Sequence, residues 1–150
     1  MKAKAKTVRQ VQAVVFFGKK IVLLKKRDSR FENGKWVFLE KAYWRLPKGK
    51  LEKGESSMQG LKRELHEECG FTKIFSARKV FHYDYEAPKG TLRKVDCYAL
   101  RISQKPKLTA NARQEGIENT ALVSPSAALK KLHWQKEKKS LKAALAKEKL

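Results

Sequence analysis

The sequence predicts an α/β fold in which a mixed β-sheet lies between helices. Apolar, β-branched segments separated by turn residues occur on both sides of one amphipathic helical segment, and more helical sequence follows at the C-terminus. Strands and helices mixed in this order bury their apolar faces by stacking helices on a sheet. A length of 150 residues suits a single domain with a hydrophobic core of useful size.

Turn residues and charged runs divide the chain into its predicted elements. The chain is expected to begin with a mobile lysine–alanine arm over residues 1–6. Before the central helix, we expect strands at 8–17, 20–26 and 36–39, a polar loop at 28–34 and an extended segment at 43–46. After it, we expect a long hairpin of 72–86 and 91–102, a polar loop at 105–116, a short strand at 121–124 and helices at 126–134 and 136–150.

The charge of the chain is strongly positive. The formal net charge is +21 and the pI is about 10.1. Such a surface attracts polyanions and raises their rate of encounter, so nucleic acid, polyphosphorylated nucleotides and inositol polyphosphates are the candidate partners. The alternative is a surface that serves solubility, because much of the charge lies at the two ends of the chain.

Cysteine usage and hydropathy suggest a soluble protein of the cytoplasm. Cys69 falls on the apolar stripe of the central helix and Cys97 lies in a predicted strand, so both are expected to be free thiols. The apolar run at 11–17 is too short for a signal peptide and lacks a cleavage site, and no segment approaches the length of a membrane span. A monomer and a homodimer are both compatible with the sequence.

The central helix is predicted from its caps and its apolar stripe. Ser56 or Ser57 suits the N-cap, and Gly70 is the expected left-handed stop after Cys69. The buried stripe should comprise Met58, Leu61, Leu65 and Cys69, which recur at steps of three or four.

Three carboxylates lie on an adjoining face of this helix. Glu64, Glu67 and Glu68 fall within an arc of roughly 100° at about 100° per residue. Carboxylates packed so closely repel one another, and hard divalent ions with oxygen ligands relieve that repulsion. Mg²⁺ also recruits water and phosphate oxygens, as attack on a pyrophosphate requires. The alternative interpretation is a solvated acidic helix face.

The run from Gly49 to Phe71 follows the pattern G-x5-E-x7-R-E-U-x-E-E-x-G-U, where U is a bulky apolar residue. Chance alone gives on the order of one match in 10⁹ windows. The run resembles the signature of the Nudix hydrolases, which hydrolyse a nucleoside diphosphate linked to another group. The resemblance implies one domain with an α/β/α sandwich. It covers about residues 8–134 and leaves a basic arm (1–7) and a lysine-rich helix (135–150) outside that core.

The resemblance also implies roles for the residues of this motif. The three helix carboxylates match metal-binding and catalytic residues, and Gly49 matches a glycine whose carbonyl often joins the metal shell. Arg63 matches an arginine that orients a neighbouring glutamate, and we count it among the catalytic residues. Glu55 and Gly70 are expected to be structural, with Glu55 bracing the loop against the helix. The implied cofactor is Mg²⁺ or Mn²⁺.

A further catalytic carboxylate usually lies in the loop before the last strand of this family. Glu115 and Glu118 both suit this position. We place Glu118 among the predicted catalytic residues and leave the choice between the two open.

The flanks of the motif bear on the substrate. The run from Trp44 to Gly49, W-R-L-P-K-G, resembles the W-x-L-P-K-G lead-in of diadenosine tetraphosphate hydrolases, and F-H-Y-D-Y at 81–85, followed by K-V at 94–95, resembles their H-Y-x-Y … K-V stretch. Tyr83 and Tyr85 share a strand face and are candidates to stack on adenine, with Lys48 and Lys94 meeting phosphates. Alternatively, the tyrosines pack within the sheet. The aromatic segment at 27–43 is expected to reshape the pocket.

The sequence therefore predicts a Mg²⁺- or Mn²⁺-dependent pyrophosphohydrolase of a polyphosphorylated nucleotide, first of all a dinucleoside polyphosphate such as diadenosine tetraphosphate. The alternative substrates are a diphosphoinositol polyphosphate, an RNA 5′-pyrophosphate and a nucleoside triphosphate. Outside the enzymes stands an RNA-binding module, although a pure binder has no use for a repulsive carboxylate cluster. Weak, nonspecific RNA binding is expected beside hydrolysis, and no membrane partner is expected.

Overall fold

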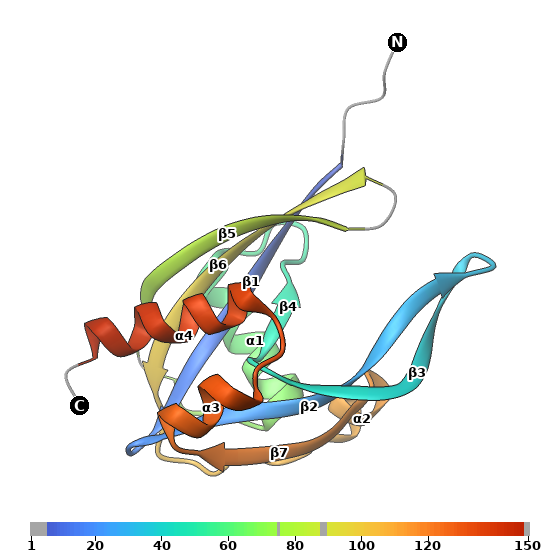
Figure 1. Cartoon of the computed structure of the whole chain (residues 1–150). Helices are drawn as coiled ribbons and strands as arrows, with labels where there is room; N and C mark the ends of the chain where they lie inside the picture. Colours follow the sequence, from blue (N-terminus) through green and yellow to red (C-terminus); the bar gives the residue numbers. More distant parts are fainter. Residues whose placement is uncertain (1–5, 75, 88–89, 149–150) are drawn as a thin grey trace.

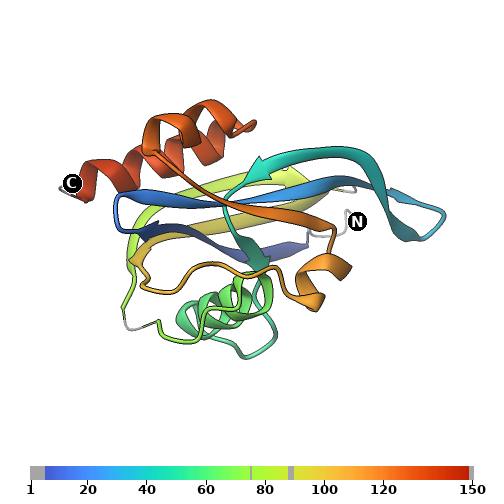
Figure 2. The ribbon, with the colours of Figure 1, turned by 90° about the horizontal axis from the view of Figure 1, so that it is seen from below.

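The computed structural model describes residues 6–74, 76–87 and 90–148. Within them a seven-stranded mixed sheet carries helices on both faces (Figures 1 and 2). The elements are β1 (Thr7–Phe17), β2 (Lys20–Glu32), β3 (Lys35–Arg45), β4 (Lys48–Lys50), α1 (Ser57–Cys69), β5 (Arg78–Ala87), β6 (Thr91–Arg101), α2 (Ala110–Gln114), β7 (Ile117–Val123), α3 (Pro125–Lys131) and α4 (Gln135–Lys147). The predicted α/β fold with a mixed sheet between helices is confirmed.

The sheet is mixed because β1 pairs in parallel with β6 and antiparallel with β2. The strand order is β3-β2-β1-β6-β5, while β4 pairs with β1 and β7 with β2. β1 and β2 pair only next to their turn, at Phe16 with Ile21 and Phe17 with Lys20. Beyond those pairs the two halves of the sheet diverge, and the short strand β4 joins β1 in the opening (Figure 1).

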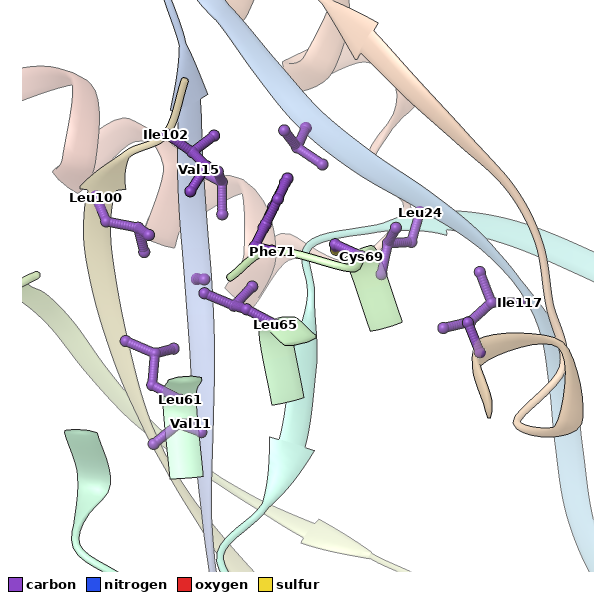
Figure 3. Packing of buried hydrophobic residues seen from close by; sticks show 13 residues of the cluster. Val11, Val15, Leu24, Leu61, Leu65, Cys69, Phe71, Leu100, Ile102 and Ile117 are labelled. Atoms are coloured by element: carbon purple, nitrogen blue, oxygen red, sulfur yellow. The ribbon is translucent and has the colours of Figure 1, made fainter. Parts of the chain in front are cut away.

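Both faces of β1 are buried from Gln10 to Phe16, and residues 13–17 form a continuous apolar run rather than an alternating one. Val11, Ala13 and Val15 point to the face covered by α1, where Leu61, Leu65, Cys69 and Phe71 join them (Figure 3). Val14 and Phe16 point to the opposite face, where the buried side chains of α3 and α4 include Ala128, Leu141 and Ala144. Figure 2 shows these two helix layers on opposite sides of the sheet.

The central helix α1 has the predicted caps. The Ser56 hydroxyl accepts from the backbone N–H of Gln59, and the Gln59 side chain accepts from the Ser56 N–H, which completes a capping box. Gly70 ends the helix in the left-handed region at φ 73°. Leu61, Leu65 and Cys69 are buried as expected, and Met58 is partly buried beside them.

The segment before the motif differs from the expectation. The predicted polar loop at 28–34 is wrong, because β2 continues to Glu32 and turns through Asn33 and Gly34, both at positive φ. The predicted pieces at 36–39 and 43–46 belong mostly to one long strand, β3. The sequence does not reveal this ribbon as one pair of long strands, because polar residues occur on both of its faces.

Smaller differences occur after the motif. The strand expected from residue 72 begins at Arg78, and the expected polar loop at 105–116 contains α2, which Thr109 caps. Residues 1–5 of the expected N-terminal arm lie outside the described residues. Both cysteines are buried free thiols, as expected. None of the helices in the described ranges has the length and hydropathy needed to span a bilayer.

Candidate active site

Arg63 organises the loop and helix of the motif. Its guanidinium donates to both carboxylate oxygens of Glu55 at 2.7 and 2.8 Å and to the backbone carbonyl of Lys50 at 2.8 Å. It also donates to Glu64 Oε1 at 2.9 Å and to Glu67 Oε2 at 3.3 Å. One side chain therefore fixes the loop, β4 and the acidic face of α1 relative to one another.

Glu55 lies between the loop and the helix. Besides its two bonds from Arg63, its Oε1 accepts from the backbone N–H of Glu52. The hydrogen bonds from Arg63 lower the pKa of Glu55 to about 2, so it is ionised throughout the neutral range. These contacts support the structural role expected for Glu55.

Glu64 also belongs to a group of three carboxylates that lie close together. Carboxylate oxygens of Glu64, Glu68 and Glu115 all lie within 4.8 Å of one another. Glu64 and Glu68 are buried, with 8% and 3% of their surface exposed. Burial raises the pKa of Glu64, and burial together with the neighbouring charge of Glu64 raises the pKa of Glu68 well above its ordinary value.

This donor set fits a hard divalent ion. Three oxygen donors converge, two of them are buried, and their charges repel one another. Arg63 forms an ion pair with one carboxylate oxygen of Glu64, Oε1. Glu64, Glu68 and Glu115 would hold the ion, which when bound would offset the cost of burying their charges.

Gly49 is packed directly against this group. It pairs with Val11 across β4 and β1, and a Cβ built on it would overlap the Glu64 carboxylate. The absence of a side chain at this position therefore allows β4 to approach the acidic face of α1.

A cavity of about 810 Å³ opens beside the carboxylates, between the two diverging halves of the sheet. Its wall is rich in cationic and aromatic groups. The basic residues are Lys26, Arg45, Lys48, Lys50, Arg93 and Lys136, and the aromatic residues are Trp36, Phe38, Tyr83, Tyr85 and Trp134. Glu64 and Glu115 border the same space, so basic side chains and two of the three converging carboxylates face one cleft.

Lys48 connects the motif to the tyrosines. Its ammonium donates to the Tyr85 hydroxyl at 3.2 Å, and that hydroxyl donates to Gln10 Oε1 at 2.9 Å. Burial, with the nearby charge of Arg45, lowers the pKa of Lys48 to about 7. An anionic phosphate beside Lys48 would favour its charged form, so this lysine is suited to receive a polyphosphate.

Glu137 is a buried carboxylate that the sequence did not indicate. It lies in α4 with 2% of its surface exposed, and its Oε1 accepts from the backbone N–H of Leu46 at 3.1 Å and from Gln12 Nε2 at 3.3 Å. Gln12 Nε2 also donates to the Tyr83 hydroxyl at 3.1 Å. Burial raises the pKa of Glu137. Helix α4, which was expected to lie outside the core, therefore holds the backbone at Leu46, two residues before Lys48.

Of the four predicted substrate residues, Lys48, Tyr83 and Tyr85 border the cleft and Lys94 does not. Tyr83 and Tyr85 share a face and border the cleft, with Tyr83 buried and Tyr85 partly exposed. Lys94 is exposed opposite Asp84, on the other face of the β5–β6 hairpin, and does not line the cleft. Arg93, opposite Tyr85, lies there instead. The error is one residue of register, which reverses the face.

The structure also separates the predicted carboxylates. Glu118 lies 4.0 Å from Arg27 Nε and outside the close group, whereas Glu115 belongs to it. Glu67 is held by Arg63 and is not one of the three converging carboxylates. Gly70 serves only the helix terminus. Sequence reasoning did not identify Arg93, Gln10 or Glu137, and only the strand register and the α4 contacts reveal them.

Comparisons with known proteins agree with this arrangement. A model of the NUDIX domain family matches residues 6–144. An 8-oxo-(d)GTP phosphatase of Mycolicibacterium smegmatis is 44% identical over 50 residues, which are 33% of this chain and only 15% of that protein. The chain belongs to the Nudix family.

Solved structures share the fold at low identity. A MutT protein from Methanosarcina mazei Go1 superposes with a TM-score of 0.74 and 18% identity, over 99% of this chain and 100% of that chain. A C. elegans Ap4A hydrolase superposes with a TM-score of 0.64 and 19% identity, over 91% and 96% of the two chains. These similarities support the α/β fold and leave the substrate to the site itself.

Proposed function

We propose that the protein hydrolyses a dinucleoside polyphosphate, such as diadenosine tetraphosphate, with Mg²⁺ or Mn²⁺ at Glu64, Glu68 and Glu115. One observation carries this proposal. A single cleft is bordered by carboxylates that could hold a metal ion, by basic side chains and by aromatic side chains of β3 and β5. A long polyphosphate with a base at each end matches that order of groups.

The metal ion and the side chains that line the cleft have distinct roles in this reaction. The divalent ion, when bound, neutralises phosphate charge and makes a nearby water more acidic. Lys48, Lys50 and Arg93 bind and orient the phosphate chain. Glu115, partly exposed at the edge of the carboxylate group, would hold the ion through one oxygen and accept the proton of the attacking water on the other.

The surrounding contacts hold these groups in position. Arg63 keeps Glu64 in place from outside the site, and Glu137 holds the backbone at Leu46 just before Lys48. Fixed donors and carboxylates of this kind lower the barrier because little reorganisation is needed during the reaction. The expected products are ATP and AMP, formed by asymmetric cleavage.

A second candidate substrate is an 8-oxo-purine nucleoside triphosphate. The observation that favours it is the 44% identity to the M. smegmatis 8-oxo-(d)GTP phosphatase. That match covers a third of this chain, so it supports the shared chemistry more strongly than a shared base preference.

A substrate panel tests the proposal. Initial rates with Mg²⁺ are compared for diadenosine tetraphosphate, ATP, 8-oxo-dGTP, ADP-ribose, a diphosphoinositol polyphosphate and a 5′-triphosphorylated oligoribonucleotide. We expect the highest kcat/KM with diadenosine tetraphosphate. A kcat/KM about tenfold higher for another substrate, a difference of about 1.4 kcal/mol in transition-state stabilisation, rejects the substrate and leaves the family intact.

A further inference from the structure

The β2–β3 ribbon is an unusual part of the cleft wall. β7 pairs with β2 as far as Lys26, and the Arg27 N–H donates to the Gly116 carbonyl just before β7. Residues 28–32 of β2 therefore lie beside β3 alone and extend away from the sheet (Figure 1). Trp36 and Phe38 of β3 are the large hydrophobic side chains that stay exposed among the described residues, at 51% and 37%. Both line the cleft rather than an outer surface.

Contacts with neighbouring side chains hold these two rings in place. Phe31 packs edge-on against Trp36, with ring centroids 5.5 Å apart and planes at 71°. Phe38 lies against Gly116, where an added Cβ would be 2.7 Å from Phe38 Cε1. Gly116 directly follows Glu115, so Phe38 adjoins the carboxylate group. Trp36 lies about 7 Å farther out on the same strand face, given two residues of β-strand.

The opposite wall carries the other aromatic groups of the cleft. Tyr85 and Arg93 come from the β5–β6 hairpin, on the other side of the opening between β1 and β2. Lys48 and Lys50 come from β4, which lies between that wall and the ribbon (Figure 1). A ligand with a planar group at each end and an anionic chain between them would complement both walls.

We propose that Trp36 and Phe38 form a distal binding site for the second nucleoside of a dinucleoside polyphosphate. This inference rests on the proposed function and adds to it the residues that distinguish a substrate with two nucleosides from one with a single nucleoside. The ring of Trp36 offers a stacking surface for a purine or pyrimidine without a hydrogen-bonding pattern. The second base is therefore bound without strong selection for its identity.

The test compares two substrates that differ only in the second nucleoside, diadenosine tetraphosphate and adenosine 5′-tetraphosphate. The Trp36→Ala variant is expected to lose about tenfold in kcat/KM on the first and less than about twofold on the second. Trp36→Tyr should restore most of the loss because it returns an aromatic surface. Val37→Ala is the matched control, since Val37 lies on the opposite face of the same strand and should change neither value.

The outcomes separate this inference from the proposed function. If the wild-type protein prefers adenosine tetraphosphate or another substrate of the panel, the proposed function fails and the distal site fails with it. If it prefers diadenosine tetraphosphate and Trp36→Ala leaves that preference unchanged, the distal site alone is rejected. A selective loss on 5′-triphosphorylated RNA would assign the ribbon to RNA, and a change in sedimentation between wild type and Trp36→Ala would assign it to self-association. Either result overturns the inference.

Discussion

Gly49 and Glu64 lie in direct contact, with the backbone of β4 against the carboxylate of α1. A Cβ at position 49 would overlap Glu64 Cδ and both of its oxygens. Glu64 is meanwhile held from the other side by Arg63 at 2.9 Å and belongs to the group with Glu68 and Glu115. The carboxylate has no room to retreat without leaving its neighbours, so this contact fixes the geometry of the proposed metal site.

The Gly49→Ala variant tests this contact. The added methyl group must displace Glu64 from Arg63 and from the other carboxylates, so kcat should fall by about 10²-fold, as when a charge-stabilising group is lost. Steady-state kinetics at saturating Mg²⁺ measures this loss, and circular dichroism checks that the fold is retained. In a Glu64→Gln background the same methyl group should cost much less, because coupled residues are not additive. Equal losses in both backgrounds would contradict the mechanism.

The carboxylates themselves should differ in importance. Replacement by glutamine keeps the shape and removes the charge, so Glu64→Gln, Glu68→Gln and Glu115→Gln should each lose about 10²-fold or more in turnover. Glu118→Gln is the matched control, since Glu118 lies outside the close group, and it should stay near the wild-type rate. Turnover and the Mg²⁺ concentration for half-maximal rate are measured for all four. A large loss at Glu118 with none at Glu115 would reverse this assignment.

Local signals in the sequence were sufficient to predict α1 and its termini. Ser56 caps it, Gly70 ends it, and Leu61 and Leu65 are buried, because caps and helical periodicity depend on residues only a few positions apart. The first two strands of the core were predictable for the same reason, since short continuous apolar runs at 13–17 and 21–24 mark β1 and β2.

The ribbon and the far side of the cleft were not predictable in this way. β2 and β3 extend beyond the sheet with polar residues on both faces, and they are ordered by pairing with each other rather than by burial. The strand register decides that Arg93 rather than Lys94 lines the cleft. The path of the turn before β7 decides that Glu115 rather than Glu118 joins the close carboxylate group. Glu137 is brought to the cleft by the docking of α4, a long-range contact without a local pattern.

The pKa of Lys48 predicts a pH-dependent effect on stability. Its pKa in the folded state, about 7, lies below the ordinary lysine value of 10.5, chiefly because of burial. Folding therefore disfavours the charged amine, so the wild-type protein gains stability as the pH rises from 7 towards the unfolded value. Lys48→Met should raise the unfolding temperature by a few degrees at pH 7, with a gain that shrinks as the pH approaches 10. It should also weaken hydrolysis, because a phosphate contact is lost.

Thermal unfolding at pH 7, 8, 9 and 10 measures this effect. Lys139→Met is the control, since Lys139 is exposed on α4, and it should give no comparable trend. A gain in the Lys48→Met variant that grows with pH has the wrong sign and would show that Lys48 is charged and stabilised in the folded protein.

The positive surface of α4 predicts weak RNA binding. Lys139 and Lys142 are exposed and Lys138 is partly exposed, and none of the three lines the cleft. Each lysine that neutralises a phosphate of single-stranded RNA adds roughly 0.7 to the slope of log K against log salt. We therefore expect sequence-independent binding that fades between about 50 and 200 mM salt, with a shallower slope after all three lysines are changed to glutamine. Nucleotide hydrolysis by that triple variant should be unchanged, since the cleft keeps its own basic residues.

Fluorescence anisotropy of labelled oligoribonucleotides measures the slope of log K against log salt. Tight binding with a flat salt dependence, or with a clear base preference, would favour an RNA-binding module over an enzyme whose surface binds polyanions incidentally.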